Sequence, residues 1–195
     1  ARCRVLAFEP NPELITALRR SILLNELTDR VVAYQLALGS GTGKGRFTAL
    51  DTTNLGGQSV TVDEEGELEI ATLDSISLDG RVAAIKIDVE GMELDVLHGG
   101  REVIARDRPL VYVECIDLEA FDAIADWARA QSYVYLATYN ATPTHLFGPS
   151  ERTDTAREQN ESAIRAVRET YRLERALRES RRAHEGAALK YRELV

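Results

Sequence analysis

Long apolar runs are missing from this sequence of 195 residues, and cysteine is scarce. No apolar run approaches the roughly 18 residues that a transmembrane helix needs, so we expect no membrane association. The two cysteines, Cys3 and Cys115, are too few for a disulfide framework and fit a reducing, cytoplasmic location. We expect both to be small buried hydrophobic residues within strands.

Basic residues are also in the minority. The sequence has 24 Lys and Arg against 32 Asp and Glu, which gives a formal net charge of −8. Proteins that bind nucleic acid normally present a basic face, so no nucleic-acid partner is expected. His98 and His145 have no Cys or His partner at ligand spacing, and we therefore expect no metal site.

What is present indicates a globular α/β protein. Hydrophobic residues make up 44% of the chain and charged residues 29%, which excludes a disordered chain. Apolar runs that favour strands alternate with helical patterns, as in a doubly wound sheet. We expect strands at 4–9, 31–37, 46–50, 68–73, 82–89, 110–115, 133–138 and 144–147, and helices at 12–25, 92–105 and 118–131.

The most informative segment is 82–93, where a strand with apolar residues on both faces ends in two carboxylates and a glycine. Ligands bind at the carboxyl ends of such strands, where Asp88 and Glu90 would lie. If the strand continues through both residues, their side chains share one face, and the pKa of one of them should be raised. Such a pair could deprotonate a hydroxyl nucleophile.

Segment 5–12 is a second strand that ends in an acid. Glu9 closes the strand, and Asn11 and Pro12 provide the N-cap and first position of a helix. A carboxylate at this place in a nucleotide-binding sheet commonly accepts hydrogen bonds from ribose hydroxyls. Glu9 is therefore a candidate cofactor contact, although a solvated acid near a helix start would have the same pattern.

Two phrases in these segments, Ala-Phe-Glu-Pro-Asn-Pro at 7–12 and Ile-Lys-Ile-Asp-Val-Glu-Gly-Met-Glu-Leu-Asp-Val-Leu-His-Gly-Gly at 85–100, resemble the FkbM family of S-adenosylmethionine-dependent methyltransferases. Thr-Leu-Asp at 72–74 and Val-Tyr-Val-Glu at 111–114 are also similar to that family. The resemblance covers roughly residues 5–148. It implies a Rossmann-like class I methyltransferase sheet and S-adenosyl-L-methionine as cofactor.

The resemblance also implies roles for single residues. The cofactor contacts would be Glu9, Pro10, Asn11, Ala37, Leu38 and Asp88. The catalytic residues would be Asp88 and Glu90, and the substrate contacts Glu114 and Asn54. The expected reaction is methylation of a hydroxyl oxygen on a small molecule or glycan.

Each of these residues also has a purely structural interpretation. Asp88 could orient its loop, and Glu90 and Glu114 could cap the helices that follow them. Ala37 and Leu38 could be ordinary strand-end packing. Asn54 lies in a variable region and could be a loop residue without a ligand contact.

The sequence departs from the family at its beginning. Class I methyltransferases start with a strand and a glycine-rich turn that holds the methionine end of the cofactor, and we find neither before Glu9. Glycine-rich segment 39–45 does not replace them, because it lacks phosphate-loop spacing and reads as a turn into another strand. We therefore expect this sequence to be a fragment of a longer protein. By itself it should have no activity and should bind the cofactor weakly or not at all.

A change in charge at about residue 150 separates a methyltransferase domain, 1–150, from a charged extension, 151–195. The extension is rich in Glu, Arg, Ala and Leu, and this composition predicts one helix over about 155–194. A weak 3-4 spacing of apolar residues permits a coiled coil, a homo-oligomer or a contact with a further domain.

Two other functions stay open. The chain could be a non-enzymatic assembly module, with a degenerate methyltransferase fold and an oligomerising helix. It could also be another nucleotide-using enzyme such as a dehydrogenase, which would need a dinucleotide glycine fingerprint ahead of Glu9.

Overall fold

The computed structural model describes residues 3–48, 58–140, 143–154 and 157–193. They form two compact units, Ala1–Glu114 and Cys115–Val195. The boundary between the two domains at residue 150 stays a prediction. Within the described ranges, no helix combines the length and the apolar character required to cross a membrane.

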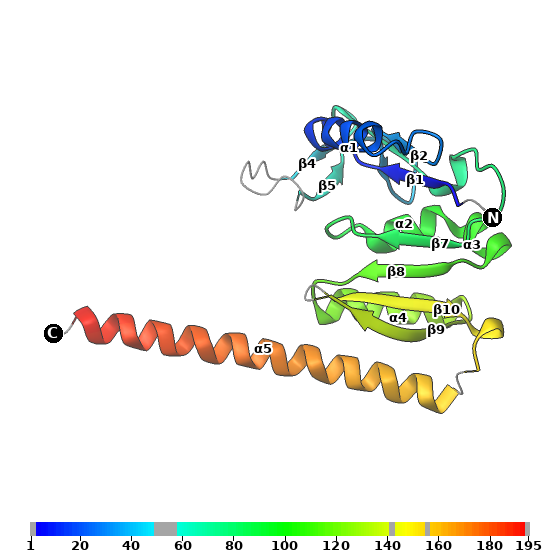
Figure 1. Ribbon diagram of the computed structural model, residues 1–195. Helices are drawn as coiled ribbons and strands as arrows, with labels where there is room; N and C mark the ends of the chain where they lie inside the picture. The colour runs from blue at the N-terminus through cyan, green and yellow to red at the C-terminus, as the bar shows by residue number, and fades with distance from the viewer. Residues whose placement is uncertain (1–2, 49–57, 141–142, 155–156, 194–195) are drawn as a thin grey trace. The chain divides into compact units, whose positions relative to one another are not determined.

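The elements of the first unit are β1 (Val5–Phe8), α1 (Pro12–Leu24), β2 (Val31–Tyr34), β3 (Ala37–Leu38), β4 (Gly43–Phe47), β5 (Val60–Val62), β6 (Leu68–Ala71), η2 (Leu73–Ser75), β7 (Ala84–Ile87), α2 (Glu93–Gly99), α3 (Arg101–Asp107) and β8 (Leu110–Glu114). In this unit a helix follows β1 and two helices connect β7 to β8, whereas β2 to β6 follow one another without an α-helix between them (Figure 1). The second unit holds α4 (Leu118–Ala130), β9 (Tyr133–Tyr139), β10 (Thr144–Pro149), η3 (Ser150–Arg152) and α5 (Arg157–Glu193).

The first strand and helix form as predicted. β1 pairs in parallel with β2, with Val5 opposite Val31 and Phe8 opposite Tyr34. The side-chain oxygen of Asn11 caps α1, because it accepts hydrogen bonds from the backbone N–H groups of residues 13 and 14 at 2.9 and 3.2 Å. The cap fixes the start of α1 two residues after Glu9, at the end of β1.

The predicted single strand at 31–37 was wrong. β2 ends at Tyr34, and Ala37 and Leu38 form β3, which pairs in parallel with β6 in a separate sheet of order β3-β6-β4-β5. The core of this sheet consists of Ala37, Val60 and Ile70. The predicted strand is divided because Ala37 is buried in the core of this second sheet, which directs residues 37 and 38 away from the β1–β2 ladder.

β7 and β8 form a parallel pair in which Ile87 lies opposite Val113. We predicted that the strand around β7 is shielded on both faces, and this was wrong: Ile87 is buried, whereas Ala84 and Lys86 are exposed. Among the described strands β7 has only β8 as a partner, so solvent reaches its other edge. Cys3 is likewise exposed, contrary to our expectation, whereas Cys115 is buried.

The helix predicted at 92–105 is interrupted, and α2 and α3 meet at Gly100. The carboxylate of Asp74 accepts hydrogen bonds from the backbone N–H groups of Glu102 and Val103, both at 2.9 Å, and so caps the start of α3. This cap comes from a segment 28 residues earlier in the chain. Periodicity within 92–105 could not reveal it.

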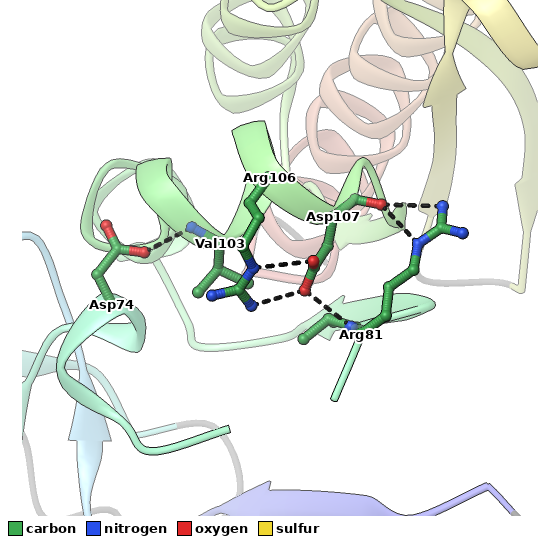
Figure 2. A network of polar contacts seen from close by, with 6 residues as sticks. Asp74, Arg81, Val103, Arg106 and Asp107 are labelled. Carbon is green, nitrogen blue, oxygen red and sulfur yellow. Dashed lines mark hydrogen bonds and ion pairs between the residues drawn. The ribbon is translucent and has the colours of Figure 1, made fainter. Parts of the chain in front are cut away.

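Asp107, the last residue of α3, is the centre of a polar network (Figure 2). Its carboxylate accepts hydrogen bonds from the guanidinium of Arg106 and from the backbone N–H of Val82 at 2.8 Å, and its backbone oxygen accepts two from Arg81. The hydrogen bond from Arg106 is the main reason that the pKa of Asp107 is lowered to about 2. The network connects α3 to the segment that leads into β7.

We expect the wild-type protein to lose stability as the pH falls from about 4 to about 2, because the lowered pKa of Asp107 stabilises the fold only while the carboxylate is ionised. Asp107→Asn should lower the free energy of unfolding at pH 7 by about 1.5–3 kcal/mol and weaken this acid dependence. Urea titrations at a series of pH values measure both effects.

Asp79→Asn is the matched control for that prediction. Asp79 also pairs with an arginine, Arg4, but its side chain is 81% exposed. Its substitution should change stability by less than about 0.5 kcal/mol. Equal effects of the two substitutions would contradict the assigned role of Asp107.

In the second unit, α5 packs against α4 and β9. Figure 1 shows its first half beside these elements and its second half continuing past them. Ile164 and Tyr171 of α5 are buried, and Arg168 pairs with Asp122 of α4 at 2.6 Å. The first half of the charged extension is therefore part of the folded unit, whereas Leu173 and Leu177 are 62% and 54% exposed.

A buried chain of hydrogen bonds holds α5 in place. The hydroxyl of Tyr171 donates to the backbone oxygen of Cys115 at 2.7 Å and lies 2.9 Å from His145 Nε2. Because that hydroxyl proton is already used, His145 carries its proton on Nε2, and Nδ1 accepts from Thr138 at 2.8 Å. Burial lowers the pKa of His145 to about 4, so it is neutral at pH 7 and has a structural role.

Candidate functional site

Asp88 and Glu114 lie next to each other at the carboxyl ends of two paired strands. The parallel register pairs Ile87 of β7 with Val113 of β8, which places the next residue of each strand side by side. The two carboxyl groups share a hydrogen bond, and Lys86 forms an ion pair with Asp88. The sequence placed each acid at a strand end but did not pair them.

Below about pH 7 the two carboxyl groups hold one proton between them. The hydrogen bond with Asp88, partial burial and the negative charge of Asp88 raise the pKa of Glu114 to about 7. The same hydrogen bond, together with Lys86, lowers the pKa of Asp88. The proton is therefore on Glu114, and a shift of this size in a strand-end carboxyl is typical of functional sites.

Glu90 does not share a strand face with Asp88, because β7 ends at Ile87. Glu90 instead adopts a left-handed backbone with φ of 53°, followed by Gly91 with φ of 102°. Partial burial and the charges of Asp88 and Glu93 raise the pKa of Glu90. Left-handed backbone at a residue other than glycine is uncommon and is concentrated at functional sites.

This turn is held by two hydrogen bonds that the sequence pattern did not reveal. The buried carboxylate of Glu93 accepts from the backbone N–H of Gly91 at 2.9 Å, and the hydroxyl of Ser59 donates to the backbone oxygen of Glu90 at 2.7 Å. Within the described part of the chain α2 starts without a side-chain cap bond, so the structure shows no helix-capping bond from Glu90 of the kind given as its structural interpretation.

A second group of polar residues lies at the end of β1. One carboxylate oxygen of Glu9 accepts a hydrogen bond from the backbone N–H of Asn11 at 2.7 Å. The side-chain N–H of Asn11 donates to the side-chain oxygen of Gln58 at 3.1 Å. Pro10 lines an open hollow of about 290 Å³, together with Gln35, Leu36, Glu67, Leu68 and Glu69.

Comparison of the chain with models of protein families gives a match to one family. The profile of the methyltransferase FkbM domain matches residues 1–135, more than half of the chain. The chain belongs to the FkbM methyltransferase family. This match confirms the resemblance to the FkbM family that was inferred from the sequence phrases at 7–12 and 85–100.

A solved structure agrees with the FkbM fold. The crystal structure of methyltransferase FkbM from Methylobacillus flagellatus is similar with a TM-score of 0.54 and 18% sequence identity. The similarity covers 74% of this chain and 36% of that chain, so the present chain spans about a third of that protein. At this identity the likeness concerns the fold alone. Together with the elements of the chain itself, including the long final helix α5, it confirms the predicted fold class. No curated protein matches the chain.

The structure places the remaining residues predicted from the FkbM resemblance as follows. Ala37 is buried in the β3–β6 core and Leu38 is half-buried beside it. Asn54 lies outside the described residues. The site roles of all the predicted residues stay predictions.

Three polar residues of this FkbM domain were missed or undervalued by sequence reasoning. Glu93 lies within the predicted helix 92–105, Gln58 in the variable region that also holds Asn54 and Lys86 within the predicted strand 82–89, and none of them was a candidate site residue. Their partners are the N–H of Gly91, Asn11 and Asp88, respectively. A glutamine two residues before a strand carries no pattern that distinguishes a buried site residue from a loop residue.

Proposed function

We propose that this FkbM domain transfers a methyl group from S-adenosylmethionine to a hydroxyl oxygen of a small molecule or glycan. The observation that carries this proposal is the Asp88–Glu114 pair at the strand ends of a methyltransferase domain, with one proton between them. Such a pair provides a proton acceptor whose pKa lies near neutral pH, where a general base works best.

Residues at the end of β1 fit the nucleoside part of the methyl donor. The Glu9 carboxylate can accept hydrogen bonds from ribose hydroxyls, and Pro10 borders a hollow beside it. The buried side-chain amide of Gln58 also contacts Asn11 through its oxygen, and its nitrogen has no hydrogen-bond partner among the described residues. S-adenosylmethionine, when bound, supplies a methyl group on a positively charged sulfur.

The chain's own residues then serve proton transfer and orientation. Glu114, once ionised, takes the proton that leaves the acceptor hydroxyl while its oxygen is methylated. Asp88, held by Lys86, fixes the position of the Glu114 carboxyl. Most of the rate enhancement comes from alignment of the two reactants. This assignment places Glu114, rather than Glu90, beside Asp88 as the group that handles the proton.

The partners of the domain are part of the same proposal. We propose a small-molecule or glycan acceptor, and a second protein surface for the exposed leucines of α5, either another copy of the chain or a further domain. A cytoplasmic location is supported by the scarcity of cysteine.

The proposal is tested with the protein expressed from its complete gene. Calorimetric titration with S-adenosylhomocysteine is expected to show one site with a micromolar Kd, and Glu9→Gln should weaken binding about tenfold. A radiolabelled methyl group from S-adenosylmethionine should reach hydroxyl compounds in an acceptor screen.

The absence of both nucleoside binding and methyl transfer would overturn this function. Sedimentation of the same non-binding protein as an oligomer would then favour the assembly module. Glu13→Gln, an exposed acid in the first turn of α1, serves as the control for Glu9→Gln.

A further inference from the structure

The side-chain amide of Gln58 is a buried group with half of its hydrogen-bonding capacity unused. Gln58 is 8% exposed, and its oxygen accepts a hydrogen bond from Asn11. Its nitrogen, Nε2, has no hydrogen-bond partner in the described structure. Buried polar side chains are nearly always paired, so an unpaired donor at this place requires an explanation.

The orientation of this amide follows from the cap of α1. The side-chain oxygen of Asn11 accepts from two backbone N–H groups, of Glu13 and Leu14. The Asn11 side chain therefore presents its N–H₂ group to Gln58, and only an oxygen of Gln58 can accept from it. Rotation of the Gln58 amide would place two donors against each other, so Nε2 is the atom without a partner.

The position of Gln58 is fixed by the residues that follow it. The Ser59 hydroxyl donates to the Glu90 backbone oxygen, and Val60 is buried in the core of the β3–β6 sheet. Gln58 thus stands between the two groups of candidate site residues. It contacts Asn11 through its side chain and is followed by a residue that contacts the Glu90 turn.

The chemistry around Gln58 defines the group that would satisfy it. Nε2 needs an acceptor atom, and the Glu9 carboxylate, which already accepts from the backbone N–H of Asn11, can accept a further hydrogen bond. A hydroxyl can do both, because it donates its proton and accepts through its lone pairs. Two adjacent hydroxyls on a sugar ring can bond to a carboxylate and an amide N–H, and Glu9 and Gln58 each hydrogen-bond to Asn11.

We propose that Gln58 binds a ribose hydroxyl of the nucleoside methyl donor through its side-chain Nε2, and that it forms one recognition site with Glu9. This inference rests on the proposed function and names a residue that recognises the donor's sugar. The hydroxyl donates to the carboxylate of Glu9 and accepts from the amide of Gln58.

The test compares Gln58→Met with the wild type, using S-adenosylhomocysteine and its 2′-deoxy and 3′-deoxy forms in calorimetric titrations of the protein from its complete gene. We expect Gln58→Met to weaken binding of S-adenosylhomocysteine about tenfold. Removal of the contacted hydroxyl should weaken binding to the wild type by a similar factor, but should have little further effect on the variant.

Gln58→Glu is the second variant, because its carboxylate can still accept from Asn11 while the donor is removed. It should show the same loss of discrimination between the ribose and deoxyribose ligands. Gln159→Met, on α5, is the control and should bind all three ligands like the wild type.

Each outcome decides the matter. If the wild type does not bind S-adenosylhomocysteine, the proposed function fails and this inference fails with it. If the wild type binds it but the Gln58 variants lose affinity equally for ribose and deoxyribose ligands, or lose none, only the inference is overturned. Thermal unfolding of each variant verifies that it is folded.

Discussion

Glu114→Gln is expected to lower kcat for methyl transfer by about 100-fold or more, because the variant cannot accept a proton from the acceptor hydroxyl. The wild-type rate should rise with pH through about 7, as Glu114 loses the proton that its hydrogen bond with Asp88 retains. The variant should lack this ascending limb. Initial rates from pH 5.5 to 9 measure both effects.

The same substitution has an expected effect on stability that does not depend on knowing the acceptor. Because the pKa of Glu114 is raised from 4.5 to about 7, the folded protein binds a proton more firmly than the unfolded chain does. The free energy of unfolding of the wild type should therefore fall as the pH rises from about 4.5 to about 7. In Glu114→Gln this decrease should be absent.

Glu119→Gln is the matched control for Glu114→Gln, since Glu119 is an exposed acid in the first turn of α4. It should leave both pH profiles unchanged. An ascending limb near pH 7 that persists in Glu114→Gln would show that another group handles the proton. Asp88 and Glu90 would then be the residues to test.

Gly99→Ala is expected to lower the free energy of unfolding by at least about 3 kcal/mol, the upper end of the usual cost of overpacking. A β-carbon at position 99, the last residue of α2, would lie 2.0 Å from the backbone oxygen of Gly39. Relief of this clash requires backbone movement, because no side-chain rotation can separate the two atoms. Urea unfolding measures the loss, and a very large one would appear as insoluble protein.

Gly41→Ala is the control, because a β-carbon at position 41 would meet nothing within 4 Å. It should change stability by less than about 0.5 kcal/mol. A loss of less than about 1 kcal/mol for Gly99→Ala would show that α2 can move away from the Gly39 turn.

The close approach at Gly99 gives a physical meaning to the glycines in the phrase that resembled the FkbM family. Gly99 allows α2 to contact the backbone of the 39–40 turn, and a β-carbon on Gly100 would lie 2.9 Å from the side chain of Leu73. Both glycines serve the packing of α2 and α3. Asp88, earlier in the phrase, by contrast follows directly after strand β7.

Local patterns were sufficient for most elements. The helices at Pro12–Leu24 and Leu118–Ala130 were predicted to within one residue at each end, and their caps, Asn11 and Asp117, are adjacent to them in sequence. The strand at Leu110–Glu114 was predicted almost as closely. The signals for these elements, apolar periodicity and capping side chains, all lie within the element or next to it.

The two elements that were predicted wrongly, the helix at 92–105 and the strand at 31–37, depend on contacts that are distant in sequence. The break between α2 and α3 depends on Asp74, and the division of the predicted 31–37 strand depends on a core formed with Val60 and Ile70. In both cases the deciding contact comes from a distant part of the sequence. Periodicity within a short window contains no information about such a partner.

The sequence by itself determined the α/β class, the family and the placement of Glu9, Asp88 and Glu114 at strand ends, because these follow from local periodicity and short motifs. Only the tertiary structure decided which acids act together. The parallel register of β7 and β8 places Asp88 beside Glu114, whereas Glu90 lies beyond the end of β7 in a left-handed turn. The unpaired amide of Gln58 likewise arises from the fold, because hydrogen bonding of a buried side chain depends on neighbours brought from elsewhere in the chain.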